Sequence, residues 1–348
     1  MKTRFAASMA LIAALACVTS LSACSGGGGG SSPGSVSADC ASGHGTIGYI
    51  PKLGTDPYMV VVHDAAQKAA DATGGKIIYT SPSQATGAAQ IPFVNQLIAA
   101  KVCVIAISGS DLNSTSAALA QAKAAGIKVL SWDSDIDPGS RQIFINQAPT
   151  AQLGEYQLKS LSALLGPEGG QFAILSSTPT AVNQNAWIDA MKKEIASNPD
   201  YKNLELVKVA YGQEQADVNA QQAVALAQAY PDLKGMIIPA GLGYPAAAQA
   251  LQKAGLFPKI KLTGLAPVSL IKDYIATGSA QDVWWNVGNL GTLSYYAAQA
   301  LATGKITGAE GDTFTAGDLG TFTVGKNGEV LLGNADIVTK DNVDKFPF

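Results

Sequence analysis

Short apolar segments alternate with alanine-rich segments of helical periodicity along most of this chain. In the first half, the pattern predicts strands over Thr46–Pro51, Lys76–Ser81, Val102–Ser108, Lys128–Trp132 and Gln142–Asn146, and helices over Pro57–Ala72, Ala88–Ala100 and Ser114–Ala125. Continuous apolar strands set between helices are typical of parallel sheets that are buried on both faces. Right-handed crossovers between such strands place helices on both sides of an open sheet.

The same rhythm restarts near residue 150 and indicates a second, similar lobe. It predicts helices over Ala151–Leu165, Trp187–Ser197, Ala216–Ala229, Pro245–Ala254 and Val268–Ala276, and strands over Gln171–Ser177, Leu204–Tyr211, Gly235–Pro239, Lys261–Gly264 and Gln281–Trp285. The last 35 residues, Phe314–Phe348, lose the helical periodicity and are expected to form short strands. We therefore predict an α/β protein with two doubly wound parallel-sheet lobes.

The first 23 residues have the pattern of a secretory signal peptide. Two positive charges precede the apolar run Phe5–Val18, which is too short for a membrane span. The motif Leu21-Ser22-Ala23-Cys24 resembles the bacterial lipobox, in which the cysteine is lipidated and becomes the new N-terminus. Small residues are common and Cys17 also lies in an apolar run, so a chance match is the alternative. The motif predicts lipidation at Cys24 and an extracytoplasmic protein anchored to the cell membrane.

Residues 24–39 are expected to form a flexible, lipid-anchored tether. The segment Ser25–Ser37 contains six glycines and five serines, and Val36 is its one residue suited to a core. Such a segment cannot bury enough apolar surface to offset its ordering entropy.

Composition narrows the possible functions of the remaining chain, which is about 310 residues long and suits one large or two medium domains. The 26 acidic and 23 basic residues nearly balance, and no basic stripe indicates nucleic-acid binding. No apolar run after Cys24 approaches the roughly 20 residues of a membrane helix. The two histidines, His44 and His63, have no second ligand at metal spacing, so we expect no metal, no cofactor and no histidine-based triad.

Two cysteines remain after the tether, Cys40 and Cys103. Outside the cytoplasm a disulfide between them is permitted. Cys40 precedes the first predicted strand and Cys103 opens the third, and these strands are neighbours in a doubly wound sheet, so a bridge is geometrically plausible. The alternative is a buried thiol at Cys103 and an exposed one at Cys40.

Polar and aromatic residues follow the predicted strands, where ligands bind in open α/β sheets. They are Lys52, Trp132, Asp133, Asp135, Asn146, Asn183, Gln184, Pro239, Gly241, Trp285 and Asn286. Carboxylates and amides accept and donate as sugar hydroxyls require, and indoles offer an apolar face to C–H groups. The set contains no nucleophile beside a base. It therefore predicts a cleft for a polyhydroxylated ligand, and crowding by Tyr58, Trp132 and Trp285 favours a small one.

Each of these residues also has a purely structural interpretation. Asp133 and Asp135 can cap the turn after a strand, Asn183 can be a helix N-cap, and Lys52 can be solvated. Trp284 and Trp285 alternate along a strand, so we expect Trp285 in the cleft and Trp284 in the core.

From Thr46 to the C-terminus, the chain resembles the type I periplasmic substrate-binding proteins of sugar importers, in the branch with autoinducer-2-binding and rhamnose-binding members. The resemblance rests on Ile50-Pro51-Lys52, Trp132-Asp133-Ser134-Asp135, Ile145-Asn146-Gln147, Asn183-Gln184-Asn185-Ala186-Trp187 and Pro245-Ala246-Ala247-Ala248-Gln249. It implies two lobes that close around a ligand through three crossovers, which we place near residues 147, 287 and 312. The lobes would then comprise residues 40–147 with 288–312, and residues 148–287 with 313–348.

By this resemblance, an autoinducer-2 pocket would use Lys52, Asp133, Gln184, Pro239 and the residue at position 241. The family's acidic residue at position 183 is asparagine here, and Gly241 stands where the family has alanine. Trp285-Asn286 matches the sugar-binding members better. These departures favour a neutral sugar or sugar alcohol over autoinducer-2.

Two other functions compete with this interpretation. Residues 320–327 match most of the motif of a phosphate-binding loop. However, Asn327 replaces the required Ser/Thr, and no helix is predicted to follow. Ser269 and Lys272 have the Ser-x-x-Lys spacing without its partner motifs, so we do not expect an enzyme. Autoinducer-2-type binding or ligand sensing for a membrane receptor stays open beside transport. We expect a monomer that binds a small neutral sugar or polyol and works with the permease and ATPase of an ABC importer, touching the membrane through its lipid alone and binding no nucleic acid.

Overall fold

The computed structural model describes residues 38–346, and the predictions for the signal peptide and for Cys24 lie outside this part of the chain. The first lobe is built on a six-stranded sheet in the order β13-β5-β4-β3-β1-β2, in which all pairs are parallel. Its strands are β1 (Thr46–Ile50), β2 (Lys76–Tyr79), β3 (Val104–Ile107), β4 (Lys128–Trp132), β5 (Ile143–Asn146) and β13 (Glu329–Leu331). The order reverses next to β1, as in a doubly wound sheet.

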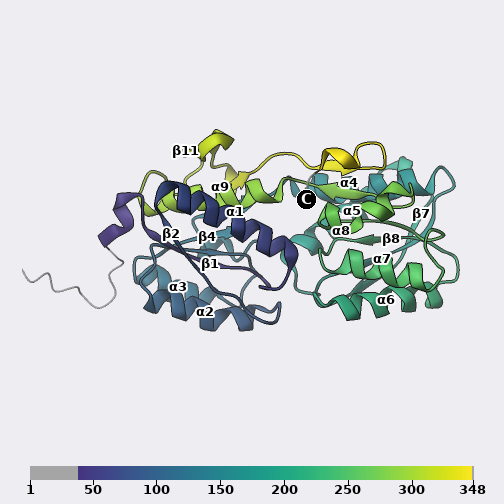
Figure 1. Cartoon of the computed structure of the whole chain (residues 1–348), viewed down its shortest axis with the longest axis horizontal. Helices are drawn as coiled ribbons and strands as arrows, with labels where there is room; N and C mark the ends of the chain where they lie inside the picture. Colours follow the sequence, from purple (N-terminus) through teal and green to yellow (C-terminus); the bar gives the residue numbers. More distant parts are fainter. Residues whose placement is uncertain (1–37, 347–348) are drawn as a thin grey trace, which may run out of the picture. The chain divides into compact units, whose positions relative to one another are not determined.

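Helices cover both faces of this sheet (Figure 1). They are α1 (Pro57–Thr73), α2 (Gly87–Ala99), α3 (Ser116–Ala124) and α9 (Val287–Ala302). α1 and α9 pack on one face and α2 and α3 on the other, so that β3 is completely buried between them. A Cβ atom on Gly291 of α9 would overlap the carbonyl oxygen of Val62 in α1, which explains why the two helices need glycine there. α9 was not among the helices predicted from the sequence.

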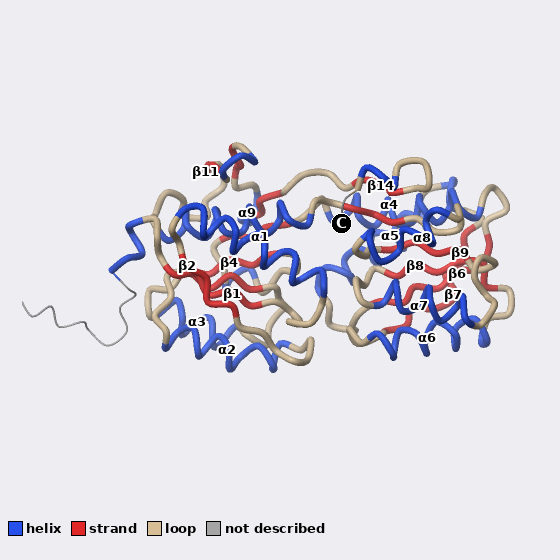
Figure 2. The backbone as a smooth tube through the Cα atoms, viewed as in Figure 1, coloured by secondary structure: helices blue, strands red, loops and turns tan. Residues whose placement is uncertain are grey.

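The second lobe repeats this architecture with a four-stranded parallel sheet in the order β7-β6-β8-β9 (Figure 2). Its strands are β6 (Gly170–Ser176), β7 (Leu204–Tyr211), β8 (Leu233–Ile238) and β9 (Lys261–Gly264). Its helices are α4 (Thr150–Leu165), α5 (Val182–Ser197), α6 (Ala216–Ala229), α7 (Gly243–Lys253) and α8 (Val268–Ala276). The predicted α/β class with parallel sheets flanked by helices is confirmed.

The chain passes between the two sheets three times: after β5, between β10 (Asp282–Trp284) and α9, and between β13 and β14 (Asp336–Val338). β10 and β14 pair antiparallel, as do β11 (Thr313–Thr315) and β12 (Thr321–Thr323). The prediction of a last crossover near residue 312 is wrong. Glu329–Leu331 pair with β5, and Phe314 and Val324 are buried in the core of the first lobe, so the chain leaves that lobe only after Leu331.

A disulfide joins Cys40 to Cys103, with the two Cα atoms 5.3 Å apart. Cys40 lies in the short 3-10 helix Ala38–Ser42, and Cys103 directly precedes β3. The bridge therefore fixes the segment that enters β1 to the neighbouring strand. Within residues 38–346, no helix combines the length and the apolar character that crossing a bilayer requires.

Candidate ligand-binding site

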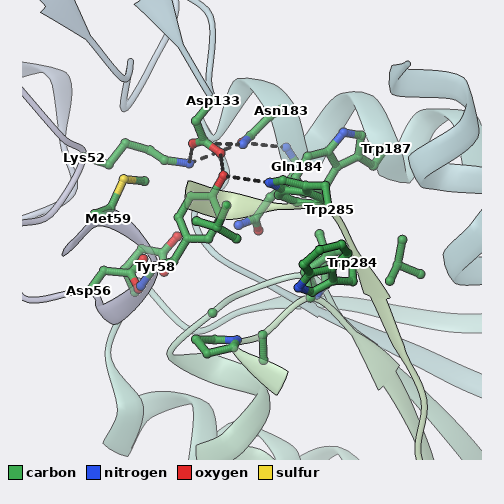
Figure 3. Close-up of a pocket in the computed structure, with 18 residues that line it drawn as sticks. Lys52, Asp56, Tyr58, Met59, Asp133, Asn183, Gln184, Trp187, Trp284 and Trp285 are labelled. Atoms are coloured by element: carbon green, nitrogen blue, oxygen red, sulfur yellow. Dashed lines mark hydrogen bonds and ion pairs between the residues drawn. The ribbon is translucent and has the colours of Figure 1, made fainter. Parts of the chain in front are cut away.

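A pocket lies where the carboxyl ends of strands from both sheets meet (Figure 3). Including its opening to solvent, it has about 530 Å³ of empty space between the lining atoms. Eight residues that the sequence analysis selected line it: Lys52, Tyr58, Asp133, Asn183, Gln184, Pro239, Gly241 and Trp285.

A polar cluster of Lys52, Asp133 and Asn183 joins the two lobes at one side of the pocket. Lys52 follows β1 and Asp133 follows β4, whereas Asn183 lies in the first turn of α5. The Nζ atom of Lys52 is 3.4 Å from Oδ2 of Asp133 and donates to Oδ1 of Asn183 over 3.4 Å. Nδ2 of Asn183 donates to Oδ2 of Asp133 over 3.4 Å. The ion pair is buried, since the side chains of Lys52 and Asp133 are 7% and 3% exposed.

Asp133 is held by further contacts within the first lobe. Its backbone has a φ of 61°, a left-handed conformation that aspartate tolerates better than most residues, and its N–H donates to the carbonyl oxygen of Ile145. Ser108 Oγ donates to Oδ2 over 3.1 Å, and the Tyr58 hydroxyl donates to Oδ1 over 2.9 Å. The carboxylate is thus oriented before any ligand arrives.

Aromatic rings form the wall beside this cluster. Nε1 of Trp285 donates to the Tyr58 hydroxyl over 3.3 Å, and the two rings meet edge to face with centroids 5.9 Å apart. Trp187 lies against Trp285, with centroids 6.4 Å apart. Burial raises the pKa of Tyr58, and the negative charge of Asp133 raises it further, so the hydroxyl stays a donor. Apolar ring surface next to fixed donors and acceptors suits a sugar, which presents C–H groups and hydroxyls together.

Gln184 offers an unused donor to the pocket. Its Oε1 accepts from Ser176 Oγ over 2.7 Å and from the backbone N–H of Ser177 over 2.8 Å. These bonds fix the side-chain amide, while its Nε2 has no partner among the described residues. The orientation leaves Nε2 free to donate to a ligand oxygen.

Two further carboxyl groups, Asp56 and Glu214, line the pocket and were not selected from the sequence. Asp56 is the N-cap of α1, and its Oδ1 accepts from the N–H of Tyr58 over 3.0 Å. Burial raises the pKa of Asp56 to about 7, and the charge of Glu214 contributes to the rise. Gly241 contacts this region from the second lobe, because a Cβ atom there would lie 3.4 Å from Oδ1 of Asp56.

Four predicted site residues do not line the pocket. Trp132 is fully buried and stacks on Tyr49, with ring centroids 4.8 Å apart. Asp135 is paired with Arg141, whose Nη2 donates to its Oδ2 over 2.7 Å. Nδ2 of Asn146 donates to Glu329 over 2.7 Å, and Asn286 is the exposed N-cap of α9. The partners of these four side chains lie within the fold, and their predicted contact with a ligand stays a prediction.

Part of the pocket lining was not predicted from the sequence, namely Asp56, Met59, Trp187, Glu214, Leu265, Ala266, Pro267, Val283, Trp284 and Val287. Trp284 was expected in the core, but it lines the pocket while its ring packs edge-on against Phe346, with centroids 4.8 Å apart. Glu214 could have been found, because it lies in the loop that follows β7. Within the described part of the chain, no group of three or more His, Cys, Asp or Glu side chains is placed to hold a metal ion.

Two parallel-sheet lobes, three crossovers and a polar pocket between the lobes define a type I periplasmic binding protein. Residues 47–306 match the model of the periplasmic binding protein domain, and the chain belongs to this family.

Solved structures of similar proteins agree with this assignment. An ABC transporter solute-binding protein from Clostridium phytofermentas with bound L-rhamnose is 35% identical, with a TM-score of 0.83, over 87% of this chain and 98% of that one. A sugar ABC transporter protein from Actinomyces odontolyticus is 35% identical, with a TM-score of 0.70, over 90% of this chain and 100% of that one. LsrB from Clostridium saccharobutylicum in complex with AI-2 is 27% identical, with a TM-score of 0.81, over 87% of this chain and 100% of that one. The predicted resemblance is therefore confirmed.

Proposed function

We propose that this protein captures a small neutral sugar or polyol and delivers it to the permease of an ABC importer. The aromatic side chains of Tyr58 and Trp285 crowd the pocket and favour a ligand of about four to six carbons over an oligosaccharide. The observation that carries the proposal is the cluster of Lys52, Asp133 and Asn183, which connects the two lobes directly at the pocket. A ligand that replaces or extends these bonds would stabilise the closed arrangement of the lobes, as in hinge-type binding proteins.

The charge of the pocket supports a neutral ligand. Among the described residues, Lys52 is the one cationic side chain that lines it, and Lys52 is paired with Asp133. Asp56 and Glu214 add negative charge. An anionic ligand would meet these carboxyl groups without a free cation, whereas hydroxyl groups can donate to them.

The relatives support a sugar over autoinducer-2. The rhamnose-bound protein is 35% identical to this chain, and the AI-2-bound protein is 27% identical. Asn183 supplies an amide at the contact between the lobes, which can both donate and accept toward a neutral hydroxyl.

A thermal-shift screen of residues 25–348 tests this function. The panel contains tetritols, pentitols, pentoses, hexoses, L-rhamnose and other deoxyhexoses, and autoinducer-2. A ligand that binds only the folded protein at 100 times its Kd stabilises it by about 2.7 kcal/mol, which raises the Tm by several degrees. One stereospecific sugar or polyol hit supports the proposal. A shift with autoinducer-2 alone, or with no member of the panel, contradicts it.

We also propose that the protein is held at the outer face of a membrane by lipid on Cys24. The family is extracytoplasmic, and the motif Leu21-Ser22-Ala23-Cys24 precedes the Gly/Ser-rich segment. Such a tether would keep the binding protein at high effective concentration near its permease.

A further inference from the structure

Two carboxyl groups face the pocket from opposite lobes. Asp56 precedes α1 in the first lobe, and Glu214 lies between β7 and α6 in the second. Each residue is only 6% exposed. The loop that carries Glu214 is fixed by backbone bonds, since the N–H groups of Gly212 and Gln213 donate to the carbonyl oxygens of Ser176 and Ser177 over 2.7 Å.

The carboxyl group of Glu214 has no hydrogen-bond or ion-pair partner within residues 38–346, and its Oε2 is completely buried. Asp56 uses Oδ1 to accept from the N–H of Tyr58, and its Oδ2 has no partner in the same part of the chain. A buried carboxylate without a partner is strongly disfavoured. The missing partners are therefore expected to be ligand groups and protons.

No cation in the described chain neutralises this pair. The charged and titratable groups whose charges interact with Asp56 are Glu214, Asp133, Lys52 and Tyr79, and Tyr58 lies directly against it. Lys52 is the single positive group among them, and it is paired with Asp133 at 3.4 Å. The pair formed by Asp56 and Glu214 thus lies in a pocket whose one positive charge is already compensated.

We propose that Asp56 and Glu214 bind ligand hydroxyl groups from opposite lobes as a pair that carries one proton, so that ligand capture takes up a proton. The protonated carboxyl group donates and accepts, while the ionised one accepts, which matches two hydroxyls on a small polyol. This inference rests on the proposed function and extends it, because it adds a second polar contact region and a dependence on pH.

The direction of the pH dependence follows from the position of Asp56. Burial, with a contribution from the charge of Glu214, raises the pKa of Asp56 from 3.8 to about 7 when the lobes enclose it. When the lobes separate, solvent reaches the carboxyl group and its pKa falls toward the ordinary value. At pH values between 3.8 and about 7, closure of the lobes therefore takes up a proton. Within this range, ligand affinity falls by up to about tenfold for each unit that the pH rises, and above it ligand affinity no longer changes with pH.

Calorimetric titration with L-rhamnose at pH 5.5, 6.5 and 7.5, in two buffers of different ionisation enthalpy, measures affinity and proton uptake together. We expect the wild-type Kd to rise by roughly 10- to 100-fold over this range, with up to one proton bound per ligand. Asp56→Asn keeps a good N-cap but cannot titrate, so its Kd should stay constant with pH. Glu214→Gln should move the loss of affinity to lower pH, because it removes a neighbouring negative charge. The matched control Glu155→Gln changes an exposed glutamate on α4 and should follow the wild-type profile.

Thermal unfolding at saturating L-rhamnose provides a second test. With the lobes closed on the ligand the pKa of Asp56 is raised, so its protonation stabilises the liganded folded protein at low pH, and this contribution is lost as the pH rises toward 7. The Tm of liganded Asp56→Asn relative to liganded wild type should therefore increase between pH 5 and pH 8. A difference in Tm between the liganded proteins that is constant with pH, or a wild-type affinity that is constant or increases with pH, overturns the inference. A folded protein that binds no sugar of the panel at any of these pH values overturns the proposed function instead.

Discussion

Removing the charge of Asp133 should weaken both ligand binding and the folded state. The carboxylate is 3% exposed, forms the ion pair with Lys52 at 3.4 Å, and accepts from Tyr58 and Ser108. Asp133→Asn keeps the size of the side chain but leaves the Lys52 ammonium buried without a counter-charge. Breaking a buried ion pair from one side costs about 3–5 kcal/mol of folding free energy. Losing a hydrogen bond to a charged group costs about 1.5–3 kcal/mol of binding free energy, or about 10- to 150-fold in Kd.

Urea unfolding and calorimetric titration of four proteins separate the two effects: wild type, Asp133→Asn, Lys52→Met and the double variant. Because Lys52→Met also removes the charge left unpaired by Asp133→Asn, the double variant should be more stable than the sum of the two single losses predicts. The difference between the measured and the summed losses is the coupling free energy of the ion pair, and it does not include the damage that each substitution does separately to the pocket.

Asp135→Asn is the matched control for this experiment. Asp135 lies two residues further along the chain but is paired with Arg141 and does not line the pocket. It should lower the free energy of unfolding and leave the Kd of the folded protein nearly unchanged. If Asp133→Asn binds as tightly as wild type, or if Asp135→Asn loses affinity equally, then the assignment of Asp133 to the ligand is refuted.

Three more predictions follow from single features. Asn286→Ala should lower the free energy of unfolding by about 1 kcal/mol, as for a lost N-cap, with little change in Kd; a loss of affinity of tenfold or more would place Asn286 in the site after all. Replacing Cys40 and Cys103 by serine should lower the free energy of unfolding by about 2–4 kcal/mol in urea, because the bridge closes a loop of 63 residues; an unchanged value under oxidising conditions would argue against the bridge. Cys24→Ala should move the protein from the membrane fraction to the soluble fraction at unchanged affinity, and retention in the membrane fraction would contradict the lipid anchor.

The lobes could be predicted from the sequence because each buried strand is a continuous apolar run between helical segments. β3, with all four of its residues buried, is the clearest example. α9 escaped detection because residues on most of its faces are buried, so that Val287–Ala302 lacks the polar face that marks an amphipathic helix. The last crossover was misplaced for a related reason. Three-residue strands such as β13 are too short to carry a period, and only pairing with β5 shows to which sheet they belong.

Most of the polar side chains that line the pocket could be selected from the sequence, but the positions of strand ends could not resolve which side chains turn toward the pocket. Trp132 and Asp133 are consecutive, and the first enters the core beside Tyr49 while the second enters the pocket. Asp135 lies two residues further on and does not line the pocket, because its carboxylate pairs with Arg141, a contact that the order of apolar and polar residues does not indicate. Asp56 was overlooked because an aspartate before Pro57 has the pattern of an N-cap, and the structure shows that it is both a cap and part of the lining.

The two contact regions of the pocket complement each other in what they require of a ligand. Around Asp133, protein donors gather at Oδ2, whereas Oδ1 accepts from Tyr58 alone among the described residues, so a ligand there can donate to Oδ1, accept from the free donor of Gln184 and pack on the aromatic wall. Around Asp56 and Glu214, carboxyl oxygens lack protein donors, so a ligand there must supply hydroxyl protons. A molecule with an acceptor at one end, hydroxyl donors at the other and an apolar face between them satisfies both regions at once. Charged sugar acids fail at the second region, because their negative charge adds to carboxyl groups that no free cation compensates. The proposed selection for neutral polyhydroxylated ligands would then follow from how this chain distributes one lysine and three acidic residues around the pocket.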